Sequence, residues 1–261
     1  MASDYSPTPE FSTRPSERHE DYDKTPTMIK GVAMQTKIVL GLTAASLLFG
    51  NAQLQTAKAR SLSKPAAHVV EQQEDGWATI KTDEGMLFVW NVKDVHFTIA
   101  IKGKDIKPIN DPDHIFFSVD GMVFQVQLAA IGEFAPDAKT KRLDDRAILA
   151  AHRDWEAKYL EDLLNTKLAV RNFNVRLSNG NDASLWQFDM PASANSEATK
   201  QVYLTSINRD YVLLLNIAVT KSISEEDSRK YLLDTMGTLR NSPDTINVQK
   251  LAASIRASTR P

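Results

Sequence analysis

The densest group of chemically capable side chains is Asp111-Pro112-Asp113-His114. Two carboxylates and an imidazole within four residues are groups that ligate a divalent metal ion. A metal-dependent hydrolase would use such a centre, together with a further ligand from elsewhere in the chain. The same residues also form an ordinary turn, in which aspartate side chains hydrogen-bond to backbone groups two residues on. We favour the turn and keep Asp111, Asp113 and His114 as a candidate metal site.

Two histidines fall inside expected secondary structure. His152 lies between Ile148 and Trp155 on the apolar stripe of a helix expected over residues 144–164. We expect it to be a structural histidine, either hydrogen-bonded or half-buried. His96 alternates with apolar neighbours in an expected strand, which predicts an imidazole that faces solvent.

Three carboxylates of the same helix, Glu156, Glu161 and Asp162, have the chemistry of a general acid and base. Their charged neighbours predict a solvated helix face instead, with Lys158 close enough to pair. The sequence contains no Gly-x-Ser-x-Gly elbow, no His-Glu-x-x-His motif and no phosphate-binding glycine loop. We therefore expect no catalytic residues and no cofactor, which favours a protein that is not an enzyme.

Composition excludes several further classes. The chain has no cysteine, so it has no disulfides, no Cys-ligated zinc and no thiol nucleophile. The 31 Lys and Arg residues nearly balance the 33 Asp and Glu residues, which argues against general binding to nucleic acid. Hydrophobic residues make up 42% and charged residues 25%, as is typical of a globular domain.

An uncharged apolar run over residues 38–50 follows two lysines. It is shorter than the about 20 residues that a membrane-spanning helix needs. A basic start, a short apolar run and small residues after it predict a signal peptide over residues 34–52, cleaved after Ala52 or Ala59. A short helix of the domain and an uncleaved membrane anchor are the alternatives.

The segments around this run are polar. Residues 1–33 are rich in proline, serine and charge, which predicts a disordered extension. Because signal peptides rarely begin so far into a chain, we hypothesise that the true start is Met28 or Met34. Residues 53–73 are expected to be a linker. No stable transmembrane span is expected after cleavage.

A single domain is expected over residues 74–241, followed by a flexible tail over residues 242–261. Alternating strands fill its front half, and Asp120-Gly121 between two apolar runs predicts a hairpin. A long helix follows, then more strands, of which residues 211–219 are apolar on both faces and predict a central strand. A closing helix begins at Ser224 with a capping box. The expected class is α+β, an antiparallel sheet packed by a long central helix and a C-terminal helix.

The back half carries a resemblance. Strand–turn–strand up to residues 185–190, a hairpin over 201–219 and a helix ending Met236-Gly237-Thr238-Leu239-Arg240 resemble the Mog1/PsbP-like group of domains. The resemblance covers about residues 74–241 and is one of element order. It implies the same α+β architecture, and it brings no catalytic residues because none define the group. The front half, residues 76–131, carries extra strands, which leaves the strand order open.

These observations lead to an expected function. We expect an exported bacterial protein of the periplasm or cell envelope that binds a protein partner or a small apolar ligand. A pocket between the long helix and the sheet is the default site, with Trp155, His152 and Tyr159 as cleft candidates. The alternatives are a metal-dependent hydrolase at Asp111, Asp113 and His114, and an assembly factor for an envelope complex.

Overall fold

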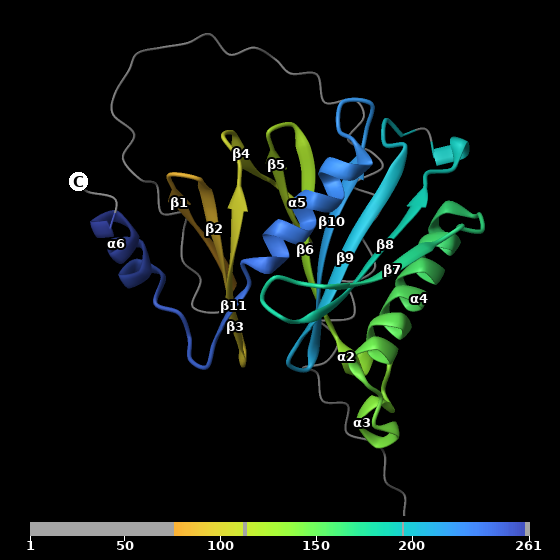
Figure 1. Cartoon of the computed structure of the whole chain (residues 1–261), viewed down its shortest axis with the longest axis horizontal. Helices are drawn as coiled ribbons and strands as arrows, with labels where there is room; N and C mark the ends of the chain where they lie inside the picture. Colours follow the sequence, from red (N-terminus) through yellow and green to blue (C-terminus); the bar gives the residue numbers. More distant parts are fainter. Residues whose placement is uncertain (1–75, 112–113, 195, 259–261) are drawn as a thin grey trace, which may run out of the picture.

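The computed structural model describes residues 76–111, 114–194 and 196–258. The expected extension, signal peptide and linker, with both candidate start methionines, lie outside the described residues. The described part of the chain forms two antiparallel sheets, of four and seven strands, with helices packed on them (Figure 1). This confirms the α+β class and the antiparallel pairing that the sequence predicted.

The larger sheet has the strand order β4-β5-β6-β10-β9-β8-β7, with every neighbouring pair antiparallel. Its strands are β4 (Ile106–Ile109), β5 (Ile115–Val119), β6 (Met122–Ala130), β7 (Arg171–Arg176), β8 (Asp182–Asp189), β9 (Lys200–Asn208) and β10 (Tyr211–Val219). β10 lies at the centre, and every residue of it after Tyr211 is buried. The prediction of a central strand is therefore confirmed.

The turn between β5 and β6 has the expected geometry. Asp120 and Gly121 both have positive φ, 49° and 88°, as a tight hairpin turn requires. The Asp120 carboxylate also accepts hydrogen bonds from the backbone N–H groups of Lys104 and Asp105. This turn therefore holds the loop before β4 as well as closing its own hairpin.

The smaller sheet has the order β1-β2-β3-β11. Its strands are β1 (Gly76–Thr82), β2 (Gly85–Val92), β3 (Val95–Lys102) and β11 (Arg240–Ser242). One face packs on β5 and β6 of the larger sheet through a shared core that includes Phe88, Phe97, Phe117 and Phe124. β11 is a strand that the sequence pattern did not indicate, and it pairs with β3 after the chain leaves the last predicted helix.

Six helical segments complete the described chain. They are α2 (Ile131–Phe134), α3 (Ala138–Lys141), α4 (Asp145–Leu164), η2 (Ala192–Ala194), α5 (Glu225–Gly237) and α6 (Val248–Ser258). The Asp144 carboxylate caps α4 by accepting from the backbone of Ala147, and Ser224 caps α5 in a reciprocal pair with Asp227. No helix in this part of the chain is long and apolar enough to cross a bilayer.

α4 and α5 cover opposite faces of the larger sheet. Because side chains alternate along a strand, successive residues of β10 point to different helices. Leu213 and Leu215 belong to the core that contains Leu232 and Met236 of α5. Leu214, between them, packs with Leu160 of α4. In Figure 1 α5 crosses in front of β9 and β10, and α4 lies along the β7–β8 end of the sheet.

The C-terminal segment corrects the expectation of a flexible tail over residues 242–261. Residues 248–258 form α6, which lies beside β1 at one end of the molecule (Figure 1). Its Val248 and Ala252 are buried against Ala78, Ile80 and Val89 on the outer face of the smaller sheet. The apolar stripe of α6 contains alanine, whose low hydrophobicity made the segment look polar in the sequence.

Candidate functional site

The buried face of α4 differs from the stripe expected from its sequence. Its buried residues are Ile148, Leu149, His152, Glu156 and Leu160. Glu156 is only 1% exposed, so the prediction of a solvated carboxylate there is wrong. The buried face is rotated toward Glu156, and the apolar Leu163 near the end of the helix is 42% exposed. Packing against the sheet buries only a narrow face of α4. The charged neighbours of Glu156 in the sequence concealed which face that is.

His152 is completely buried one helical turn before Glu156. Its ring meets the ring of Phe134 edge-on at 5.0 Å and lies 5.9 Å from that of Trp155, measured between centroids. Neither ring nitrogen has a hydrogen-bond partner among the described residues. Burial lowers the pKa of His152 to about 3, so the imidazole is neutral. The histidine is thus fully buried and not half-buried, and the hydrogen bonds of the other alternative are not found among the described residues.

Glu156 is the second unpartnered group under α4. Neither of its carboxylate oxygens has a hydrogen-bond partner in the described structure. Burial raises the pKa of Glu156 to about 7, because an apolar environment disfavours the carboxylate. Burial, and then the nearby charge of Glu156, raise the pKa of Tyr203 on β9. Near neutral pH a large fraction of Glu156 is therefore a carboxylic acid that can donate a hydrogen bond.

Two rows of side chains lie on the face of the sheet on which α4 packs. The strand register aligns Gln125, Asn216, Tyr203 and Trp186 in one row across β6, β10, β9 and β8. Two residues along, it aligns Gln127, Leu214, Thr205 and Ser184 in the next row. Trp186 and Tyr203 stack with ring centroids 3.9 Å apart. The rows bring residues from four strands to the face of the sheet on which α4 packs.

Several polar atoms of these rows are also buried without partners. They are both amide atoms of Gln127, the amide nitrogen of Gln125 and the indole nitrogen of Trp186. We call His152, Glu156, Gln125, Gln127 and Trp186 the α4 polar cluster. Their neighbours are satisfied, because Asn216 donates to Gln201 and to the Val202 carbonyl, and Thr205 donates to the Ser184 carbonyl.

Such a concentration of unpaired groups is unusual in a folded protein. Most buried polar atoms have a hydrogen-bond partner, and leaving one unpaired costs about 1–3 kcal/mol. The α4 polar cluster places acid and imidazole groups on the buried face of α4 and amide and indole groups on the face of the sheet against which α4 packs. An arrangement of this kind can bind a molecule that supplies the missing donors and acceptors.

The sequence identified part of this site. Trp155 lies beside His152, and Tyr159 is partly buried against the core around Leu160, so all three cleft candidates belong to the helix that covers the site. The sequence pattern assigned Glu156 to a solvated face, and it did not point to Gln125, Gln127 or Trp186. A signal for the glutamines was present, because they alternate within the otherwise apolar β6.

The candidate metal site is only partly described. The Asp111 carboxylate lies 2.7 Å from Nδ1 of His114, and the His114 ring lies 5.8 Å from that of Phe116. Asp113 lies outside the described residues. Among the residues that the structure describes, no group of three or more His, Asp or Glu side chains has an arrangement suited to a metal ion.

His96 is 7% exposed, which corrects the prediction that it faces solvent. Ser242 of β11 pairs with His96 in register, so the added strand continues the sheet beside it. The segment after β11 is held near the same place, because Asn91, the partner of His96 on β2, exchanges two hydrogen bonds with the backbone of Ile246. Burial of His96 thus depends on the chain after α5.

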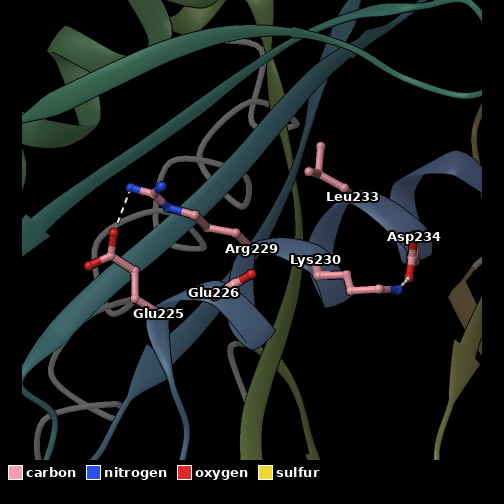
Figure 2. A pocket seen from close by; sticks show the side chains of 6 residues that line it. All are labelled: Glu225, Glu226, Arg229, Lys230, Leu233 and Asp234. Carbon is pink, nitrogen blue, oxygen red and sulfur yellow. Dashed lines mark hydrogen bonds and ion pairs between the residues drawn. The ribbon is translucent and has the colours of Figure 1, made fainter.

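Most of the charged groups that line a pocket on α5 already have ion-pair partners, namely Glu225, Arg229, Lys230 and Asp234 (Figure 2). Glu225 pairs with Arg229 at 2.6 Å and with Lys200 at 2.8 Å, and it accepts a hydrogen bond from Gln187. The hydrogen bond from Lys200 is the main cause that lowers the pKa of Glu225 to about 2. These contacts join the start of α5 to β8 and β9, so we assign this cluster a structural role.

The comparisons with known proteins do not change this choice of site. No family model matches the chain, and a search of curated proteins finds no match.

Proposed function

We propose that this protein is an exported, non-enzymatic domain of the bacterial periplasm or envelope that binds a small ligand between α4 and the seven-stranded sheet. The observation that carries the proposal is the α4 polar cluster. Its unpartnered groups are hydrogen-bond donors and acceptors, and both of its ionisable members favour their neutral forms. These properties suit recognition of a bound molecule.

Export and kinship are part of the same proposal. The basic and apolar segment before residue 52 supports export, because it has the length and order of a signal peptide. The order of strands and helices through α5 supports kinship with Mog1/PsbP-like domains. A shared fold would not imply a shared activity, so the proposed function is argued from the site.

Native mass spectrometry of the protein purified from its own envelope fraction tests this proposal. We expect a chain cleaved after Ala52 or Ala59 that carries one small molecule, which is released on denaturation. Gln127→Leu removes both unpartnered amide atoms from the site and should abolish the adduct. Asp162→Leu, on the exposed side of α4, is the matched control and should retain it.

Three outcomes would contradict the proposal. An uncleaved mass would overturn export. A cleaved chain that carries no small molecule would overturn ligand binding. Stable co-purification with a large membrane protein, again without a small molecule, would replace ligand binding with the role of an assembly factor.

A further inference from the structure

The chemistry of the α4 polar cluster specifies the class of molecule that it accepts. We infer that the ligand is an uncharged molecule that carries both hydrogen-bond donors and hydrogen-bond acceptors, such as an amide or a polyol. The inference rests on the proposed function and deepens it. It also departs from the sequence-based expectation of an apolar ligand, because an apolar molecule would leave the cluster unpaired.

An anionic ligand does not fit the site. The two rows of residues on the face of the sheet on which α4 packs contain no charged side chain. The basic residues of α4 nearest the cluster point elsewhere, because Arg153 pairs with Asp154 and Lys158 pairs with Asp162, and both acidic partners are well exposed. A buried anion is stabilised best by a paired charge, and among the described residues no Lys or Arg lies in these two rows to supply one.

A cationic ligand does not fit either. Glu156 is the only carboxylate of the α4 polar cluster, and burial favours its neutral form. Among the described residues, the nearby ionisable groups are His152, which lies one turn away on α4 and is neutral, and Tyr203, whose pKa is raised. A buried cation would therefore meet at most one negative charge, and that charge would first have to be created by deprotonation.

The donors and acceptors of the cluster complement an uncharged molecule. Trp186, Gln125 and Gln127 each offer an unpartnered N–H, and Gln127 also offers its carbonyl oxygen. Neutral His152 adds one donor and one acceptor, and protonated Glu156 adds a donor beside an acceptor. Aromatic rings lie beside these groups, since Phe134 and Trp155 flank His152 and Tyr203 stacks on Trp186. The site thus combines mixed polar groups with apolar surfaces.

A matched set of small probes tests the charge class. Acetamide, sodium acetate and ethylammonium chloride are similar in size and differ in charge. We would titrate each into the ¹⁵N-labelled protein at constant ionic strength and follow the indole N–H resonances, with that of Trp186 assigned by Trp186→Phe. Trp77, which packs between the two sheets, provides an internal reference.

We expect acetamide to give a saturable shift of the Trp186 resonance and the two ions to give none. Glu156→Gln, which keeps a neutral hydrogen-bonding group, should retain the shift. Glu156→Leu should abolish it and should fold, because it places an apolar side chain at a buried position. Asp162→Leu, on the exposed side of α4, should behave as the unmodified protein.

A saturable shift by acetate or by ethylammonium, or by none of the three probes, would overturn the inference. So would an identified native ligand that carries a charge. In each case a small-molecule adduct in the native mass spectrum would leave the proposed function standing. Failure of the charge class is therefore distinguishable from failure of ligand binding.

Discussion

Glu156 and His152 are two ionisable residues that are buried under α4. They lie one turn apart on the buried face of α4, and neither has a hydrogen-bond partner in the described chain. Burial moves their pKa values in opposite directions, up for the acid and down for the base, because it disfavours the charged form of each. Both residues are therefore mainly neutral between about pH 3 and about pH 7.

Glu156 predicts a loss of stability at alkaline pH. Because its folded pKa is raised from 4.5 to about 7, its contribution to stability is fully present below 4.5 and is lost as the pH rises through 7. Glu156→Gln removes this titration. We therefore expect the difference in the free energy of unfolding, variant minus unmodified protein, to be about 3 kcal/mol larger at about pH 8.5 than at about pH 4. Urea unfolding at the two pH values measures this difference.

His152 titrates in the opposite sense. Its folded pKa is lowered, so its contribution to stability is present above its usual pKa of 6.5 and is lost as the pH falls toward 3.

Asp162→Asn, on the exposed side of α4, is the control for the Glu156 experiment and should follow the unmodified protein. Parallel stability curves for Glu156→Gln and the unmodified protein across this range would contradict a buried, titrating Glu156.

At the scale of elements, α6 and β11 cover or extend parts of the four-stranded sheet that the other elements leave exposed. α6 covers the outer face of the four-stranded sheet, where Ile80 and Val89 would otherwise meet water. β11 extends the same sheet beyond β3. Both follow α5 in the chain. The last described elements therefore pack on the same sheet that contains the first described strand, β1.

Two adjacent alanines of α6 give a matched test of this packing. Ala252 is buried against the sheet and Ala253 is exposed. Ala252→Asp places a carboxylate in the apolar contact and should lower the free energy of unfolding by on the order of 3 kcal/mol. Ala253→Asp should change it by less than about 0.5 kcal/mol. Urea midpoints of the two variants provide the comparison, and equal midpoints would show that α6 does not pack on the sheet.

At the scale of the whole molecule, one core joins the two sheets. Phe117 of β5 lies 5.9 Å from Phe88 and 6.0 Å from Trp77 of the smaller sheet, measured between ring centroids. Val126 and Leu215 of the larger sheet belong to the same cluster as Phe97 and Ile99 of the smaller one. The two sheets therefore share one apolar interior, which favours unfolding in a single cooperative transition.

Phe117→Ala tests this shared core. Truncating a buried phenylalanine should cost about 3–5 kcal/mol, with tryptophan fluorescence and circular dichroism still reporting one common transition. Phe173→Ala is the control, because that ring is 42% exposed, and it should cost less than about 1 kcal/mol. Two separate transitions in the unmodified protein would mean that the sheets are independent.

The amino-acid sequence by itself determined the features that local rules control. The start of α4 at Asp144, the capping of α5 by Ser224 and the turn at Asp120-Gly121 follow from short-range hydrogen bonding and backbone geometry. The central position of β10 follows from its unbroken apolar run. Each of these features depends on residues that are near neighbours in the chain.

Only the tertiary structure decided which polar groups are buried together. Glu156 is buried because the sheet contacts a face of α4 that includes it, and periodicity could not locate that face among charged neighbours. Gln127 and Trp186 reach the same face of the sheet only through the pairing of β6, β10, β9 and β8. Such pairing joins residues far apart in the chain, so the site depends on long-range packing, which no local pattern encodes.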